Sequence, residues 1–144
     1  MTKQNLHTVY LGLGTNIGNR SENMATAYKK IEKLIGTIVR QSAFYVSEPW
    51  GFESENDFLN SVICCQTIHS PRDVLQLTQQ IEQEMGRTQK SDNHVYHDRI
   101  IDIDILLYDH LTIHEPDLQI PHPLMKQRPF VMEPLKEIIP PEEL

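Results

Sequence analysis

The segment DRIIDIDILL, residues 98–107, decides the fold because it predicts a buried strand with two different faces. Side chains alternate along a strand, so every second residue of the segment points to the same side. One side is expected to pack against helices and consists of Ile101, Ile103, Ile105 and Leu107. The other side carries Asp102 and Asp104, about 7 Å apart at about 3.4 Å per residue. We therefore expect one face of this strand to pack in the hydrophobic core and the other face to present two carboxylates.

Hydrophobic periodicity and turn residues on either side of this segment predict the remaining elements. The expected strands are 7–13, 37–47, 57–68 and 100–108, and the expected helices are 21–35, 71–85 and 130–138. Residues 87–98 have no period and are expected to be a polar loop, and short turns are expected before the last helix. The order predicts an α+β, ferredoxin-like βαββαβ fold, an antiparallel sheet with two helices on one face and a C-terminal extension.

Length and composition are those of an ordinary globular protein. The 144 residues predict a single domain, 1–144, and the net charge of −7 argues against a nucleic-acid binder. No apolar run reaches the roughly 18 residues of a membrane span, and no signal peptide is evident, so the expected location is cytoplasmic. Cys64 and Cys65 are adjacent and are expected to be buried, reduced thiols on a strand.

The two aspartates are the first candidate for a ligand site. Carboxylates on one face of a strand repel each other unless a cation lies between them, and aspartate is depleted in strands. Mg²⁺ is bound through one or two carboxylates together with substrate phosphates and water. Asp102 and Asp104 are therefore interpreted as metal ligands; the alternative is an exposed strand with two solvated acids.

A glycine-rich segment, GLGTNIG at 12–18, invites a dinucleotide-binding interpretation because it follows a strand and leads into a helix. Its spacing is one residue longer than the fingerprint, and Arg40 and Gln41 stand where an acidic residue would hold the ribose. We therefore interpret the glycines as a tight turn packed closely on the sheet.

Phe58 and Asn60 lie two residues apart on an expected strand and so share a face. An aromatic ring beside an amide is a suitable platform for a flat heterocycle. The aromatic ring stacks on the face of the heterocycle, and the amide forms hydrogen bonds with its edge. The alternative is that Phe58 is an ordinary core residue.

Over nearly its whole length the chain resembles the 6-hydroxymethyl-7,8-dihydropterin pyrophosphokinase family. The motifs that carry the resemblance are LGLGTNIG at 11–18, FY at 44–45 with Pro49, FLN at 58–60, QQIE at 79–82 with GR at 86–87, RIIDIDIL at 99–106, IPHP at 120–123 and RPF at 128–130. The resemblance implies transfer of the pyrophosphoryl group of ATP to the hydroxymethyl group of the dihydropterin, with release of AMP. It also suggests a monomer.

The resemblance further implies a role for each matching residue. Two Mg²⁺ ions would be held by Asp102 and Asp104, and the transferred group would be clamped by Arg87 and Arg99. The nucleotide site would consist of Gln79, Glu82, Ile105, His122 and Arg128. The pterin site would consist of Ser47, Trp50, Phe58, Asn60 and Phe130. Residues 87–98 would close over both substrates.

The chain departs from the family pattern at several positions. Asp98 precedes the arginine of the acid-pair motif, and Glu48 stands where the family often has proline. The expected loop has Gln89, Lys90, His94 and Tyr96 where arginine and tryptophan are familiar. Two other functions are alternatives: a two-metal nucleotidyltransferase, which would release pyrophosphate, and an RNA-recognition module, which the net charge and the paired aspartates oppose.

Overall fold

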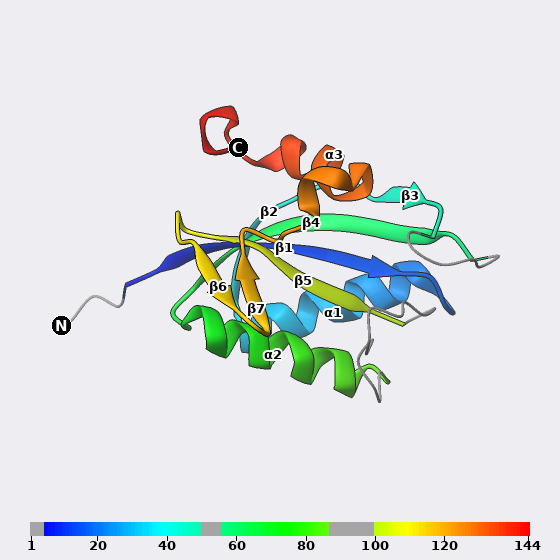
Figure 1. Ribbon diagram of the computed structural model, residues 1–144. Helices are drawn as coiled ribbons and strands as arrows, with labels where there is room; N and C mark the ends of the chain where they lie inside the picture. The colour runs from blue at the N-terminus through cyan, green and yellow to red at the C-terminus, as the bar shows by residue number, and fades with distance from the viewer. Residues whose placement is uncertain (1–4, 50–55, 87–99) are drawn as a thin grey trace.

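The computed structural model describes residues 5–49, 56–86 and 100–144. A central antiparallel sheet is covered by two helices on one face and by a third helix on the other (Figure 1). The strands are β1 (His7–Thr15), β2 (Gly36–Gln41), β3 (Tyr45–Ser47), β4 (Phe58–Thr67), β5 (Asp102–Tyr108), β6 (Ile113–Glu115) and β7 (Leu118–Ile120). The α-helices are α1 (Arg20–Leu34), α2 (Pro71–Glu84) and α3 (Pro129–Ile138), with short 3₁₀ turns at Met125–Gln127 and Pro141–Glu143.

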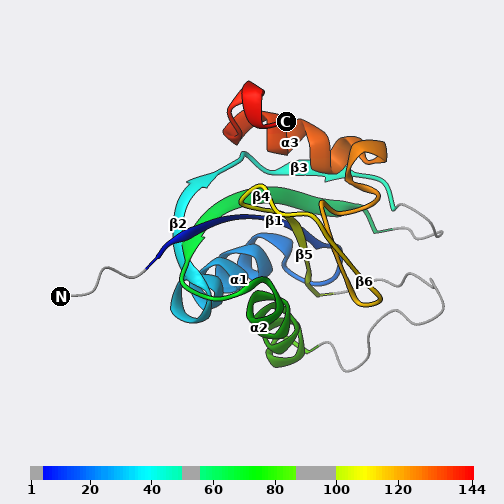
Figure 2. The ribbon, with the colours of Figure 1, turned by 60° about the vertical axis from the view of Figure 1, so that its left-hand side comes forward.

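Strand β1 lies at the centre of the sheet, whose order is β2-β4-β1-β5, and β3 also pairs with β4. Each of these strand pairs is antiparallel. Viewed from a second direction, the sheet separates α3 from α1 and α2 (Figure 2). The antiparallel sheet and the two helices on one face agree with the sequence prediction.

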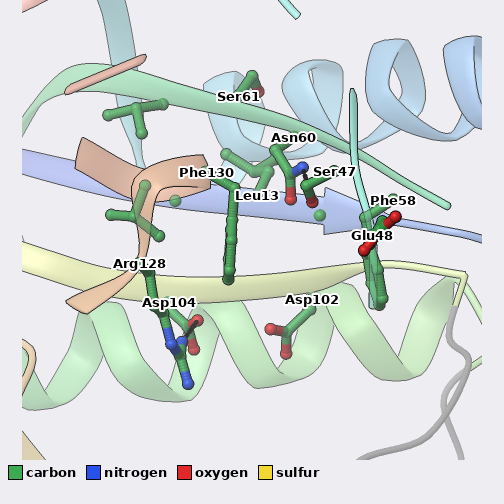
Figure 3. Close-up of a pocket in the computed structure, with 14 residues that line it drawn as sticks. Leu13, Ser47, Glu48, Phe58, Asn60, Ser61, Asp102, Asp104, Arg128 and Phe130 are labelled. Carbon is green, nitrogen blue, oxygen red and sulfur yellow. Dashed lines mark hydrogen bonds and ion pairs between the residues drawn. The ribbon is translucent and has the colours of Figure 1, made fainter. Parts of the chain in front are cut away.

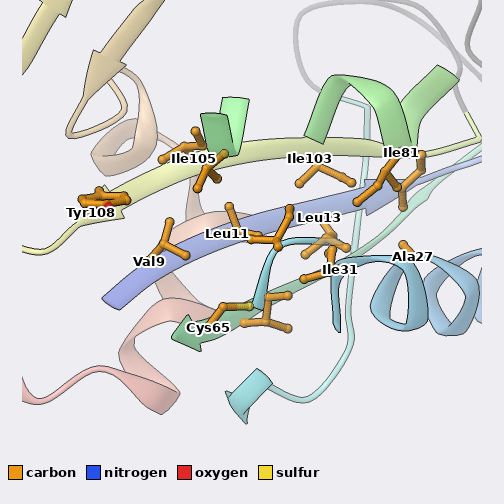
Figure 4. Close-up of a cluster of buried hydrophobic side chains, with 14 of the residues drawn as sticks. Val9, Leu11, Leu13, Ala27, Ile31, Cys65, Ile81, Ile103, Ile105 and Tyr108 are labelled. Carbon is orange, nitrogen blue, oxygen red and sulfur yellow. The ribbon is translucent and has the colours of Figure 1, made fainter. Parts of the chain in front are cut away.

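The face toward α1 and α2 forms the larger hydrophobic core (Figure 4). Strand β1 contributes its odd-numbered residues, as alternation requires, and each helix contributes one stripe at helical spacing. These residues are buried: Val9, Leu11 and Leu13 from β1, Met24, Ala27 and Ile31 from α1, and Val74 and Ile81 from α2. Capping fixes where both helices begin, since Asn19 accepts a hydrogen bond from Glu22 N and Ser70 accepts one from Asp73 N.

The opposite face forms a smaller core beneath α3. Its buried members are Tyr10, Val62, Cys64, Leu106, Met125, Val131, Leu135, Ile138 and Ile139. Cys65 belongs to the larger core, so the two adjacent cysteines are buried on opposite faces of β4, and both are free thiols. The prediction of buried, reduced cysteines on a strand is confirmed.

The prediction for Leu107 was wrong. Ile101, Ile103 and Ile105 do lie in the larger core, but Leu107 packs against the smaller one. The cause is an irregularity between β1 and β5: Leu11 is opposite Ile105, yet Tyr10 is opposite Leu107, so β5 has one extra residue. A β-bulge of this kind reverses the alternation beyond it.

Three other sequence interpretations need correction. The expected strand 37–47 is interrupted after Gln41, and β3 resumes at Tyr45. The glycines at 12 and 14 lie within β1 and the turn comes only at Gly18, so they do not form the tight turn that we expected. The region expected to contain short turns holds a β-hairpin, β6–β7, before α3. Among the described residues, no helix is long and apolar enough to cross a bilayer.

Gly36 provides a test of the sheet's close packing. A Cβ atom placed there would lie 2.0 Å from the backbone oxygen of Gln66 on β4, so the strands would have to separate. We expect Gly36→Ala to lower the free energy of unfolding by about 2–3 kcal/mol, measured by denaturant titration. Gly12→Ala is the control, because its Cβ would meet only the Leu106 side chain at 3.4 Å. Equal stability of the two variants would contradict this packing.

Candidate active site

A pocket opens on the α3 face of the sheet, where β1, β3, β4, β5 and α3 meet (Figure 3). It is lined by Gly12, Leu13, Gly14, Ser47, Glu48, Phe58, Asn60, Ser61, Val62, Asp102, Asp104, Arg128, Phe130 and Val131. Residues from distant parts of the sequence therefore line one pocket.

The floor of the pocket is formed by the glycines of β1. In the sheet Gly12 lies between Val62 and Asp104, and Gly14 lies between Asn60 and Asp102. A Cβ at Gly14 would lie 3.3 Å from both Asn60 Oδ1 and Phe58 Cδ1. Because neither position has a side chain, the space above β1 stays open between the acids of β5 and the polar side chains of β4.

The amide of Asn60 is held in one orientation. Its side chain is almost completely buried, and Nδ2 donates to the backbone oxygen of Tyr45 at 3.0 Å and to Ser47 Oγ at 2.7 Å. With the amide nitrogen engaged on the β3 side, Oδ1 lies over Gly14 on the pocket side. The arrangement presents a fixed hydrogen-bond acceptor to a ligand's N–H groups.

Two half-buried aromatic rings reach the pocket from different elements. Phe58 comes from β4 and Phe130 from the first turn of α3 (Figure 3). Phe58 lines the pocket, which favours the ligand-platform interpretation over the core alternative. Two rings beside a fixed amide are a suitable site for a planar heterocycle.

The acidic side of the pocket consists of Asp102 and Asp104, which are half-buried and lie side by side on β5 (Figure 3). Arg128 is buried at the N-cap of α3, with Nη1 3.8 Å from Asp104 Oδ2. Its guanidinium carbon also lies 5.8 Å from the centre of the Phe130 ring. Arg128 therefore connects the acidic and aromatic parts of the pocket, and it offsets only part of the negative charge on β5.

His122 lies in the segment between β7 and α3 and is held by its backbone and its ring. Its N–H donates to Leu106 O at 3.0 Å, and Nδ1 is 3.2 Å from Leu124 N, whose N–H it accepts. Burial and the nearby charge of Arg128 lower the pKa of His122 to about 4, although Asp102 acts in the opposite direction. At neutral pH the ring is therefore neutral with its proton on Nε2, which makes it a hydrogen-bond donor.

The structure brings together seven of the predicted site residues. They are Ser47, Phe58, Asn60, Asp102, Asp104, Arg128 and Phe130. Trp50, Arg87 and Arg99 lie outside the described residues, as do Lys90, His94, Tyr96 and Asp98.

The other predicted nucleotide residues lie away from this pocket's lining. Ile105 is buried in the larger core, and Gln79 is half-buried on α2. Glu82 is buried on α2, and its Oε2 accepts the backbone N–H of Ile103 at 2.9 Å. These residues belong to the α2 side of β5, whereas the acids of β5 face the pocket.

The other seven lining residues were not predicted as site residues: Gly12, Leu13, Gly14, Glu48, Ser61, Val62 and Val131. The signal for the glycines was available: their positions alternate with core residues of β1, which places them on the same face as the acids of β5. Glu48 belongs to the segment 47–50 whose backbone the family resemblance places near the pterin edge, but its side chain departs from the family pattern.

The donor set suits a hard cation that shares its ligands with a substrate. Among residues 5–49, 56–86 and 100–144 no group of three or more His, Cys, Asp or Glu side chains is arranged to hold a metal by itself. Two neighbouring carboxylates match Mg²⁺, which completes its shell with phosphate oxygens and water, better than they match a tetrahedral zinc site.

The depressed pKa of His122 predicts a pH-dependent stability. The unfolded histidine, at its ordinary pKa of 6.5, takes up a proton before the folded one at about 4. Stability is therefore fully present above pH 6.5 and is lost as the pH falls toward 4. Relative to His122→Asn, we expect the wild type to lose about 2 kcal/mol over this window, after allowance for solvent screening.

The measurement is thermal unfolding of both proteins from pH 7 to 4 in the presence of a chelator. His110→Asn, on an exposed turn after β5, controls for loss of a histidine. A constant difference between wild type and His122→Asn across this range would contradict the assignment of a buried, neutral ring.

Comparison with known proteins identifies the family. Residues 10–140 match the family described as 7,8-dihydro-6-hydroxymethylpterin-pyrophosphokinase (HPPK). The chain is similar to the 2-amino-4-hydroxy-6-hydroxymethyldihydropteridine pyrophosphokinase of Porphyromonas gingivalis, with 47% identity over 92% of this chain and 90% of that protein. The enzyme of the same name from Aquifex aeolicus is 40% identical over 92% of this chain and 81% of that protein.

Solved structures share the fold at lower identity. The HPPK-DHPS of Plasmodium falciparum in its A437G form with SDX-DHP superposes with a TM-score of 0.77 at 18% identity, over 96% of this chain. An HPPK-DHPS in complex with substrates gives a TM-score of 0.74 at 17% identity, over 93% of this chain. The chain spans only 43% and 40% of those longer proteins, so these two likenesses concern the fold alone. The family match over residues 10–140 and the two relatives at 47% and 40% identity show that the chain belongs to the 7,8-dihydro-6-hydroxymethylpterin-pyrophosphokinase family.

Proposed function

We propose that this protein transfers the pyrophosphoryl group of ATP to the hydroxymethyl group of 6-hydroxymethyl-7,8-dihydropterin and releases AMP, a step of folate synthesis. The observation that carries the proposal is a single pocket in which Asp102 and Asp104 stand across β1 from Phe58 and Asn60. A phosphate-handling group and a heterocycle-binding group on one sheet face are what this transfer requires. The names of the relatives at 47% and 40% identity describe the same reaction.

The heterocycle would be bound by the aromatic part of the pocket. Phe58 and Phe130 would stack on the two faces of the pterin ring, since stacking requires only a flat π surface. Asn60 Oδ1, fixed by the bonds that Nδ2 makes to β3, would accept from N–H groups on the ring's edge. Ser47 and Trp50 would complete this edge.

The phosphates would be bound at the acidic part. Asp102 and Asp104 would hold Mg²⁺, and we propose two ions, because the reaction gathers several phosphate charges beside two carboxylates. Bound Mg²⁺ neutralises phosphate charge and aligns the groups in a displacement at phosphorus. Arg128 lies beside this position and would contact the nucleotide.

The remaining nucleotide contacts are proposed along β5. His122 would donate from Nε2, because its ring is neutral and Nδ1 accepts from Leu124 N. Gln79, Glu82 and Ile105 would contact the nucleotide from the α2 side, where Glu82 already accepts the backbone N–H of Ile103.

Arg87 and Arg99 would clamp the transferred pyrophosphoryl group. Arginine suits this role because its planar fork can bond two phosphate oxygens at once. The hydroxymethyl oxygen would attack the β-phosphorus, the bond from that phosphorus to the oxygen bridging it to the α-phosphorus would break, and AMP would leave while the alcohol loses its proton.

We also propose that the core of the fold is a ferredoxin-like unit. Its four long strands lie in the order β2-β4-β1-β5 with antiparallel neighbours, and α1 and α2 cover one face, which supports this classification. Strand β3, the β6–β7 hairpin and α3 would then be additions to that unit.

The proposed reaction is tested by identifying the nucleotide product. The protein is incubated with Mg-ATP and the dihydropterin alcohol, and the products are separated and followed by phosphorus NMR. We expect AMP and a pterin that carries two phosphates. Release of inorganic pyrophosphate together with an adenylylated pterin would instead indicate a nucleotidyltransferase and contradict the proposal.

The acid pair is tested by truncation. We expect Asp102→Ala or Asp104→Ala to lower kcat/KM about a thousandfold, or about 4 kcal/mol, because the metal-bound phosphates lose a ligand. We expect both variants to keep the fold, and Tm is measured alongside because Asp104 also pairs with the buried Arg128. Glu22→Ala, an exposed acid in the first turn of α1, is the control. Near-normal turnover of either aspartate variant at saturating Mg²⁺ would exclude the pair as metal ligands.

The aromatic pair is tested by paired measurements of affinity and stability. We expect Phe58→Ala and Phe130→Ala to weaken pterin binding by about 1–3 kcal/mol and to leave ATP affinity nearly unchanged. Phe44→Ala is a matched control, because that ring is 46% exposed and lies outside the pocket lining. A large fall in Tm with unchanged pterin affinity would show that these rings serve only the core.

A further inference from the structure

We infer that Glu137, near the end of α3, is a positioning residue for the pterin pocket: it joins α3 to β3 and so sets the spacing between the two walls that would hold the pterin ring. The inference rests on the proposed function, because it concerns the same pocket. Glu137 does not line the pocket, and none of the substrate contacts proposed above involves it.

The carboxylate of Glu137 bonds two successive parts of the chain. Oε1 accepts the backbone N–H of Ala43 at 2.8 Å, and Oε2 accepts the hydroxyl of Tyr45. Ala43 lies in the connector between β2 and β3, and Tyr45 is the first residue of β3. A single side chain of α3 therefore holds both the approach to β3 and its first residue.

Strand β3 connects Glu137 to the pocket residues of β4. It is only three residues long, and Tyr45 is opposite Asn60 while Ser47 is opposite Phe58 on β4. The Asn60 amide donates to the backbone oxygen of Tyr45 and to Ser47 Oγ. Tyr45 thus receives the Glu137 carboxylate at its hydroxyl and the Asn60 amide at its carbonyl, so a displacement of Tyr45 would turn the amide that faces the pocket.

Helix α3 connects Glu137 to Phe130, which lines the other side of the pocket. Phe130 and Glu137 are seven residues apart, about two helical turns, and therefore lie on the same side of the helix. The helix between them is anchored by Val131 and Leu135, which are buried in the smaller core. The ring at one end and the carboxylate at the other move together as parts of one packed helix.

The charge states of Glu137 and Tyr45 agree with these hydrogen bonds. The hydrogen bond from Tyr45, followed by that from Ala43, lowers the pKa of the Glu137 carboxyl, and the bond to Glu137 raises the pKa of the Tyr45 phenol. At neutral pH the carboxylate is therefore charged and Tyr45 keeps its donor proton. Hydrogen bonds to a charged acceptor are stronger than neutral ones, which suits a contact that holds the first residue of a three-residue strand.

The test compares four variants: Tyr45→Phe, Glu137→Ala, the double variant that combines these two changes, and the control Glu133→Ala. Alanine is used at position 137 because glutamine could still accept the Ala43 N–H and donate to the Tyr45 hydroxyl oxygen. Glu133 is a matched control, because it is an exposed acid one turn earlier on the same helix and forms an ion pair with Lys136 at 3.8 Å. Tyr45→Phe removes one hydroxyl and leaves the backbone oxygen that Asn60 uses. For each protein, kcat and the KM values for the dihydropterin and for ATP are measured, together with Tm.

We expect Tyr45→Phe and Glu137→Ala each to raise the pterin KM about three- to tenfold and to leave the ATP KM within about twofold of the wild type. Both KM values of Glu133→Ala should stay within about twofold of the wild type. The double variant should be no worse than Glu137→Ala alone, because that change already removes the acceptor of the Tyr45 hydroxyl. This non-additive pattern, confined to the pterin, is the result that a general loss of stability would not produce.

Three results with the variants would overturn this inference and leave the proposed function standing. An unchanged pterin KM with a lowered Tm would show that the contact between Glu137 and Tyr45 only stabilises the fold. Equal rises in both KM values would show a general distortion, and additive effects would show that Tyr45 and Glu137 act separately. Failure of the wild type to form AMP would refute the proposed function and this inference with it, and it would be seen before any variant is compared.

Discussion

The antiparallel register of β1 between β4 and β5 is the constraint on which the rest of the site depends. It places Gly14 between Asn60 and Asp102, and Gly12 between Val62 and Asp104. A side chain at either position would occupy the space that separates the acids from the amide and the rings. Since strand spacing in a sheet is fixed by backbone hydrogen bonds at about 4.8 Å, the two halves of the site are held within a ligand's length of each other.

The two faces of the sheet are used for different purposes. The face toward α1 and α2 carries the larger core, whereas the face toward α3 carries a smaller core at one end and the pocket at the other. The bulge in β5 separates these regions: before it, Asp102 and Asp104 face the pocket, and beyond it Leu106 and Leu107 both pack beneath α3. Helix α3 then contributes to both, with Leu135 in the core and Phe130 in the pocket.

The features that depend on local alternation could be predicted from the sequence. Asp102 and Asp104 share a face, as do Phe58 and Asn60, because residues two apart on a strand must do so. The placement of Leu107 could not be predicted in this way, since a bulge is decided by pairing with β1. The presence of Phe130 and Phe58 in the lining of one pocket also depends on tertiary packing, and only the family resemblance predicted it. The contact of Glu137 with Tyr45 left no pattern in the sequence, because it joins two surface-accessible side chains far apart in the chain.

We propose that one sheet face, opened by two glycines, holds the metal-bound phosphates and the heterocycle together. The most direct test is a crystal structure of the protein with Mg²⁺, a non-hydrolysable ATP analogue and the dihydropterin alcohol. We expect Mg²⁺ at about 2.1 Å from oxygens of Asp102 and Asp104, with the pterin between Phe58 and Phe130 and its edge on Asn60 Oδ1. A pterin bound outside this pocket, or Mg²⁺ and phosphates bound away from the two aspartates, would contradict it.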